Sequence, residues 1–214
     1  MEKIHQPFKA VIFDMGGVFI RTLPQNNRQE LASKYGISAE ELTKMVFLST
    51  ESIDAEKGLI SRDDLMRQLM QTLGEDVEKV QQFIEDFFKN DYEDKELVNY
   101  VRTLRPQYKL GLLSNAFLGT REWMEERHEF LGLFDVSYFS AEVGMRKPEE
   151  PFFQLILDAL QVEPSETLFV DDFIENIKGA QKMGIQTVWY HDRDAAFAYL
   201  RSILDTSNTR IGWV

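Results

Sequence analysis

Residues 9–18 read KAVIFDMGGV, a short run of β-branched and aromatic side chains that ends at Asp14 and is followed by Gly16 and Gly17. Such a run predicts a buried strand, and the glycine pair predicts a tight loop directly after it. We therefore expect a carboxyl group at the end of a buried strand, close to a flexible turn of the backbone.

Four further apolar runs of strand length alternate with helical patterns downstream. Strands separated by helices of this length require right-handed parallel crossovers, which place helices on both faces of a sheet. The sequence therefore predicts an α/β fold whose core is a doubly wound, Rossmann-like parallel sheet. The expected strands are 109–113, 136–139, 167–170 and 186–190, and the expected helices are about 94–104, 149–160 and 175–183.

The segment between the first strand and the rest has helical periodicity from about residue 23 to residue 88 and no convincing strand. Ser38 and Ser61 are expected to begin helices, because an acid follows each after three residues, at Glu41 and Asp64. Structureless connections beyond about 15 residues are uncommon in compact domains. The segment is therefore expected to be an inserted α-helical cap.

The chain length of 214 residues suits a core domain that carries a smaller insertion. We expect residues 1–20 and 95–214 to form the core domain and residues 21–94 to form the helical cap. Phe83, Phe87 and Phe88 have helical spacing, so we expect them to pack inside the insertion.

Charge and composition exclude several classes of function. The net charge of -12 argues against binding to nucleic acids or anionic membranes, which requires a positive surface. The absence of cysteine excludes disulfides, thiolate nucleophiles and zinc-thiolate sites. No apolar run approaches the roughly 18 residues of a membrane span, and the start MEKIHQPFKA lacks a signal-peptide pattern, so we expect a cytoplasmic location.

Polar side chains stand where three of the apolar runs end. Asp14 follows the first run, Ser114 and Asn115 follow 109–113, and Asp171 and Asp172 follow 167–170. In open parallel sheets, ligands bind outside the carboxyl ends of the strands. The sequence therefore predicts a site that gathers these residues at one edge of the sheet.

A fourth piece supplies a cation. Lys147 lies in the probable loop GMRKP, residues 144–148, in which Pro148 is expected to begin the next helix. Acid, hydroxyl and cation together suit phosphoryl transfer, in which the protein positions a nucleophile and neutralises charge on the transferred oxygens. We expect Asp14 to attack phosphorus and Lys147 to balance the remaining charge.

The remaining residues have expected roles around the phosphate and a metal ion. Asp14 and Asp172 are expected to hold Mg2+, with Asp171 acting through a water, because Mg2+ prefers a few oxygen ligands. The Ser114 hydroxyl and backbone N–H groups near Gly17 and Asn115 are expected to donate hydrogen bonds to the phosphate. This hypothesis requires Asp14, Asp172 and Lys147 to converge in space.

Each residue also has a plainer interpretation. An aspartate that ends a strand is more often a helix cap or turn former, and the Asp171–Asp172 pair would suit the start of the helix near residue 175. Ser114 would suit a turn, and Lys147 would suit a solvated surface position. The joint pattern favours the site, because caps and turns give no reason for these residue types to share one edge of the sheet.

Four segments resemble the motifs of the haloacid dehalogenase-like (HAD) hydrolase superfamily: FDMGGV at 13–18, LLSNA at 112–116, GMRKPEEPFF at 144–153 and VDDFIENIKGA at 170–180. The insertion resembles the first cap class of that superfamily. The nearest resemblance is to bacterial sugar-phosphate phosphatases related to glucose-1-phosphatase and to the amino-terminal domain of soluble epoxide hydrolase.

The resemblance implies specific roles for these residues. Asp14 would be the nucleophile, Ser114 and Lys147 would contact the phosphate, and Asp14, Asp172 and the Gly16 carbonyl would hold Mg2+. Phosphatases of the superfamily usually carry a second aspartate two places after the nucleophile, and this chain has Gly16 there. Losing that general acid forfeits about a hundred- to ten-thousand-fold in rate.

Four functions compete on this evidence. The first is a Mg2+-dependent phosphatase acting on a small phosphorylated metabolite, with a sugar phosphate as the expected substrate. The second, motivated by Gly16, is a non-catalytic phosphometabolite-binding or interaction protein. A receiver-like phosphoacceptor and a halide-releasing dehalogenase rank lower, because neither accounts for a late pair of aspartates at Asp171 and Asp172. The sequence specifies neither the ester nor the oligomeric state.

Overall fold

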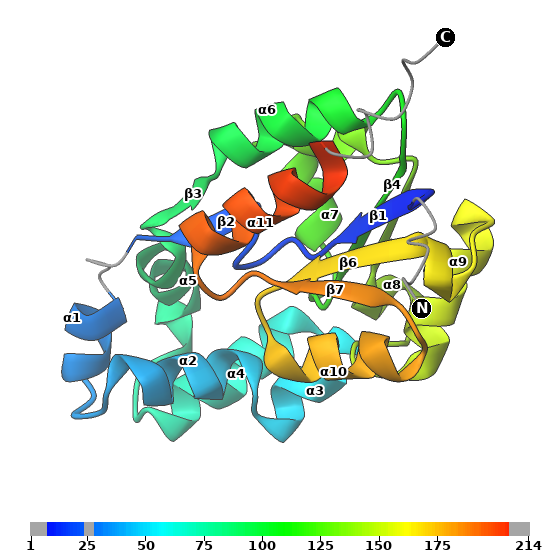
Figure 1. Cartoon of the computed structure of the whole chain (residues 1–214). Helices are drawn as coiled ribbons and strands as arrows, with labels where there is room; N and C mark the ends of the chain where they lie inside the picture. The colour runs from blue at the N-terminus through cyan, green and yellow to red at the C-terminus, as the bar shows by residue number, and fades with distance from the viewer. Residues whose placement is uncertain (1–7, 24–27, 206–214) are drawn as a thin grey trace, which may run out of the picture.

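The structure is a computed structural model that describes residues 8–23 and 28–205. Its core is a five-stranded parallel sheet with helices on both faces, so the predicted fold class is confirmed (Figure 1). The strand order is β5-β4-β1-β6-β7, so β1 lies at the centre of the sheet. The direction in which the chain adds strands reverses between β1 and β6. The strands are β1 (Ala10–Phe13), β4 (Lys109–Ser114), β5 (Val136–Phe139), β6 (Thr167–Asp171) and β7 (Gln186–Trp189).

The two faces of the sheet bury separate hydrophobic clusters, because successive side chains of a strand point to opposite faces. Val11 and Phe13 of β1 pack with α6 and α11, whereas Ala10 and Ile12 pack with α9 and α10 (Figure 1). The helices of the core are α6 (Lys95–Leu104), α7 (Thr120–Glu125), α8 (Ser140–Val143), α9 (Glu150–Leu160), α10 (Ile174–Lys182) and α11 (Arg193–Asp205), with short 3-10 helices η2 (Phe130–Leu133) and η3 (Pro164–Glu166).

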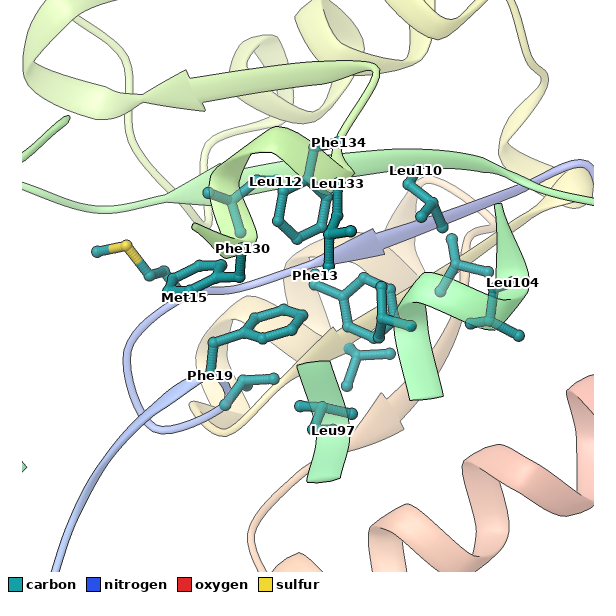
Figure 2. Packing of buried hydrophobic residues seen from close by; sticks show 14 of the residues in the cluster. Phe13, Met15, Phe19, Leu97, Leu104, Leu110, Leu112, Phe130, Leu133 and Phe134 are labelled. Carbon is teal, nitrogen blue, oxygen red and sulfur yellow. The ribbon is translucent and has the colours of Figure 1, made fainter. Parts of the chain in front are cut away.

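An aromatic cluster anchors the segment that follows β1. Figure 2 shows Phe19 facing Phe13 and Phe130 inside the first cluster. The ring centroids of Phe19 and Phe130 are stacked 5.1 Å apart, and those of Phe13 and Phe19 meet edge to face at 5.4 Å. Because aromatic pairs stabilise by about 0.5–1.5 kcal/mol beyond their burial, Phe19 fixes the far end of the loop that carries Asp14 and the glycine pair.

The inserted region is helical and has a hydrophobic core of its own. Ser38 and Ser61 cap two of its helices, as predicted: the Oγ of each accepts a hydrogen bond from the N–H three residues later. Phe83 and Phe87 are buried in its core, and Phe88 packs against them. The elements are α1 (Arg28–Ser33), α2 (Ala39–Phe47), α3 (Thr50–Glu56), α4 (Arg62–Thr72), η1 (Val77–Lys79) and α5 (Val80–Phe88).

The helical region joins the core through a short antiparallel ribbon that the sequence does not reveal. Strand β2 (Ile20–Thr22) pairs with β3 (Asp91–Glu93), and the Thr22 hydroxyl donates to Asp91 Oδ1 at 2.6 Å. Both connections between core and insertion therefore run side by side. The domain boundaries at residues 20/21 and 94/95 stay a prediction.

Most predicted elements agree with the structure to within one or two residues, with one local correction. Pro148 does not begin a helix: α9 starts at Glu150, and Pro151 occupies its first turn. The core helices α7, α8 and α11 were not predicted from the sequence. No helix in the described ranges is long and apolar enough to cross a membrane.

Candidate active site

The predicted site residues meet at the carboxyl edge of the sheet, where the winding reverses. Asp14 follows β1, Ser114 ends β4 and Asp171 ends β6. The Asp14 N–H donates to Val170 O at 2.8 Å, so the pairing of β1 with β6 continues up to the carboxyl groups. Asp14, Asp171 and Asp172 each offer a carboxylate oxygen within 4.8 Å of the others. The expected convergence of chain segments is confirmed.

Lys147 lies at the centre of this cluster and is fully buried. Its Nζ is 2.7 Å from Asp14 Oδ1 and 2.8 Å from Asp171 Oδ2. Burial opposes its charge, but the attraction of Asp14 and Asp171 prevails and raises the pKa of Lys147 above its usual value. The interpretation of Lys147 as a solvated surface residue is therefore wrong.

Asn115 fixes the backbone of Lys147. Its Nδ2 donates to Lys147 O at 3.0 Å, and the Lys147 N–H donates to Asn115 Oδ1 at 2.8 Å. The side chain of Asn115 thus binds the lysine loop, and only its backbone N–H is left for the predicted phosphate contact. Ser114, which ends β4 beside it, is buried.

Asp14 is strongly perturbed. Burial, reinforced by the negative charges of Asp171 and Asp172, raises the pKa of Asp14 well above its usual value, although Lys147 opposes the shift. Asp14 Oδ1 also accepts a hydrogen bond from the Met15 N–H at 2.7 Å. Three carboxyl groups share one buried cation, so the cluster has the charge to hold a further cation.

Asp171 and Asp172 are neighbours with different surroundings. Asp171 has no exposed surface, and its oxygens accept hydrogen bonds from Lys147, from the Phe173 N–H at 2.7 Å and from Asn176 Nδ2 at 3.0 and 3.2 Å. It therefore positions Lys147 and the turn before α10. The N-cap of α10 is Phe173, which has no side-chain cap hydrogen bond, so the helix-cap interpretation is wrong for Asp171 and Asp172. Asn176 was not singled out from the sequence, although it lies within the last quoted motif.

Asp172 keeps its carboxylate available. Burial and the charge of Asp171 raise the pKa of Asp172 to about 6. A Cβ on Gly17 would lie 2.0 Å from Asp172 Oδ2, and Gly17 has φ +69°, so glycine is required there. The Gly17 N–H, which was expected near the phosphate, already donates to Ile20 O at 2.8 Å. The role that the structure shows for Gly17 is its close approach to Asp172.

Gly16 has a different environment from its neighbour. A Cβ built on Gly16 meets no atom within 4 Å, so the position of the usual second aspartate has room for a side chain. A hollow of about 250 Å3 lies beside this loop. It is lined by Gly17, Arg21, Thr22, Asp172, Tyr190 and His191.

The donor set fits a hard divalent cation. Oxygen ligands of the kind offered by Asp14 and Asp172 are those that Mg2+ prefers. The oxygens of Asp171 are already occupied by Lys147, Phe173 and Asn176, so this carboxylate is the least available of the three. A doubly wound sheet with acids, a hydroxyl and a buried lysine at its switch point fits the class of enzymes that bind an anionic substrate together with a divalent cation.

Comparison with known proteins agrees with this class. The profile of the haloacid dehalogenase-like hydrolases matches residues 8–184. The chain belongs to this family.

Several relatives cover almost the whole chain. A sesquiterpene phosphatase of Aspergillus oryzae is 29% identical over 92% of this chain and 97% of its own length. A D-ribitol-5-phosphate phosphatase of Bacteroides thetaiotaomicron is 28% identical over 84% of this chain and 90% of its own. The solved structure of a HAD family enzyme from B. thetaiotaomicron, in complex with magnesium and inorganic phosphate, has a TM-score of 0.68 at 26% identity and covers 84% of this chain and 92% of its own.

Proposed function

We propose that this protein is a Mg2+-dependent phosphatase that transfers the phosphoryl group of a small phosphorylated metabolite to Asp14 and then to water. One observation carries the proposal: a fully buried Lys147 lies between Asp14 and Asp171, and Asp172 belongs to the same acidic cluster. A buried lysine that contacts a strand-end aspartate is suited to an anionic ligand at that aspartate.

The chain's own residues divide the work. Asp14 attacks phosphorus, which breaks the P–O ester bond, forms an aspartyl-phosphate and releases the alkoxide, which takes its proton from water because Gly16 offers no acid. A second water then hydrolyses the aspartyl-phosphate to phosphate and free Asp14. Lys147 neutralises charge on the transferred oxygens. The Ser114 hydroxyl and the backbone N–H of Asn115 donate to the same oxygens. Asp171 and Asn115 position Lys147 from two sides.

Mg2+ would be held by Asp14, Asp172 and the Gly16 carbonyl. Asp171 is the weakest of the predicted ligands, because its oxygens already accept hydrogen bonds from Lys147, Phe173 and Asn176. When bound, the ion neutralises charge on the phosphate and on the attacking carboxylate, so that two anions can approach each other. Gly17 contributes by leaving room for the carboxylate of Asp172.

The substrate class that we propose is a small phosphate monoester, with sugar phosphates as first candidates. One relative supports a monoester, since its name specifies D-ribitol-5-phosphate, and a second relative is named as a sesquiterpene phosphatase. We also propose that residues 21–94 form a cap of the first HAD cap class on a core of residues 1–20 and 95–214, as in phosphatases related to glucose-1-phosphatase.

Gly16 favours a second candidate, a protein that binds a phosphometabolite without turning it over. The usual general acid is missing, and no side chain lies within 4 Å of the Cβ position at Gly16. A site of this kind would retain Mg2+-dependent phosphate binding while lacking proton transfer to the leaving group.

A screen of phosphate esters with Mg2+ or with EDTA tests both candidates. The set includes sugar, polyol and isoprenyl phosphates and one aryl phosphate with a good leaving group. We expect Mg2+-dependent phosphate release that Asp14→Asn lowers by on the order of 10⁴-fold or more, because the nucleophile is lost. Asp158→Asn, the same change at an exposed position of α9, serves as the matched control.

Equal turnover by Asp14→Asn and the unchanged protein would refute the phosphatase. Mg2+-dependent binding of phosphate without hydrolysis of any ester would favour the second candidate.

A further inference from the structure

We infer that Glu56 of the helical region and Arg146 of the core form a positioning pair that holds the loop of Lys147 in place for phosphoryl transfer. This inference rests on the proposed function of Lys147. It assigns a role to the helical region that the catalytic residues of the core do not explain.

The pair is short and almost enclosed. Arg146 Nε donates to Glu56 Oε2 at 2.7 Å, and Glu56 is only 5% exposed. Glu56 is the last residue of α3, and Arg146 directly precedes Lys147 in the chain. Removing either partner of such an ion pair is costly, because it leaves a buried charge without compensation.

Further contacts bring the end of α3 against the same part of the core. Lys57 Nζ lies 2.6 Å from Glu149 Oε1, so the helical region holds the chain on both sides of Lys147. A Cβ on Gly58 would lie 2.6 Å from Ala141 O, so the two backbones approach too closely for any side chain there. These contacts fix the lysine loop between Asn115 and α3.

The helical region also contacts the loop after β4, which carries Ser114 and Asn115. Phe117 follows Ser114 by three residues, yet its side chain belongs to the hydrophobic cluster of the helical region. The helical region thus contacts both core loops that are proposed to hold the phosphate. Glu56 is the one buried charged residue of the described helices α1 to α5, and Arg146 gives it a partner in the core.

Electrostatics agree with this geometry. Burial raises the pKa of Glu56, and Arg146 and then Lys147 oppose that shift. Glu56 therefore lies close enough to the catalytic lysine to interact with its charge. A displacement of about 1 Å at a catalytic group can lower the rate by about 10²-fold, so a loop held from two sides is a sensitive point for catalysis.

The test uses the full chain and the steady-state kinetics of an aryl phosphate and a larger sugar phosphate, both with Mg2+. Glu56→Gln removes one charge, and the double variant Glu56→Gln/Arg146→Gln removes both and leaves no unpaired buried charge. We expect kcat to fall about ten- to a hundredfold in both variants, with KM changed less than about threefold. Glu142→Gln, which breaks the Arg121–Glu142 pair within the core, is the matched control.

The size of the substrate separates positioning from direct contact. A pair that acts through Lys147 lowers kcat equally for the small and the large ester, whereas contact with the leaving group would affect only the larger one. Wild-type kcat in the double variant, or a fall no greater than in Glu142→Gln, would overturn the inference. An unchanged protein that hydrolyses no ester would instead refute the proposed function, and circular dichroism confirms that each variant is folded.

Discussion

The core and the helical region place their polar and charged residues near the site in different ways. In the core, Asp14, Ser114 and Asp171 stand at the ends of neighbouring parallel strands, so the pairing of the strands brings them together. In the helical region, Glu56 ends a seven-residue helix and reaches Arg146 only through tertiary packing. Strand ends therefore predict chemistry from the sequence, whereas a helix end acquires its role only after the two regions pack.

The largest gain in rate that we expect comes from placing a side chain at Gly16 in the core. Gly16→Asp places its Cβ in open space, since no atom of the described residues beyond the neighbours of Gly16 lies within 4 Å of that position. As a general acid it should raise kcat for esters with poor leaving groups by about 10²-fold, and for an aryl phosphate much less. Hydrolysis rates across a series of leaving groups check this, and equal changes for all of them would contradict an acid-base role.

Lys147→Met tests how much the buried lysine stabilises the acidic cluster at the carboxyl edge of the sheet. Without Lys147, Asp14 and Asp171 lose a cation that lies within 2.8 Å of both. We expect the free energy of unfolding to fall by about 3–5 kcal/mol in urea titrations, because a partner of a buried pair is removed. Lys182→Met, an exposed change in α10, should stay within about 0.5 kcal/mol. Equal urea midpoints for the two variants would show that the buried cluster needs no lysine.

The glycine pair gives a comparison within one loop. Gly17→Ala forces a Cβ to 2.0 Å from Asp172 Oδ2 at a positive φ, whereas Gly16→Ala meets no atom within 4 Å. We expect Gly17→Ala to lower stability by about 1–3 kcal/mol and to raise the Mg2+ concentration for half-maximal activity. Gly16→Ala should leave stability within about 0.5 kcal/mol. A Mg2+ titration in which both variants behave alike would argue against the close approach at Asp172.

The smallest effect lies in the helical region, away from Glu56. Ser38 and Glu41 form a capping box at the start of α2, with the Ser38 N–H donating to Glu41 Oε2 at 2.8 Å. Ser38→Ala should lower the free energy of unfolding by about 1 kcal/mol and leave kcat unchanged. Thermal unfolding and kinetics measure the two quantities, with Ser33→Ala at the end of α1 as the control. A large loss of kcat would mean that the whole helical region, not its contact at Arg146, governs turnover.

Local patterns explain why so much of the core could be predicted. The strand 9–13 and the capped helices at Ser38 and Ser61 depend on periodicity and short-range hydrogen bonds, and they agree with the structure. The ribbon of β2 and β3 depends on pairing between residues about 70 positions apart, such as Thr22 and Asp91. No local sequence pattern therefore predicts it. The acid, the hydroxyl and the paired acids could be found for the same reason as the strands, since they follow strand ends. Lys147 follows no strand directly, and only the loop sequence before Pro148 pointed to it.

The finer geometry of the site lay beyond sequence reasoning. Asp171 and Asp172 are the same residue type, yet one is enclosed by Lys147 and Asn176 and the other adjoins Gly17. Only the fold separates these environments. Residue type alone predicts a helix start at Pro148, whereas the first turn of α9 accommodates Pro151 instead.

The ribbon of β2 and β3 has a consequence for how such a chain diversifies. Its two strands bring residues 20–22 and 91–93 into register, so the path leaves the sheet and returns to it through adjacent positions. Because β2 and β3 are paired, the distance between them does not depend on how many helical turns lie between them in the chain. Helices between these strands can therefore be lengthened or shortened without moving the ends of β1 and β4, where the candidate site lies.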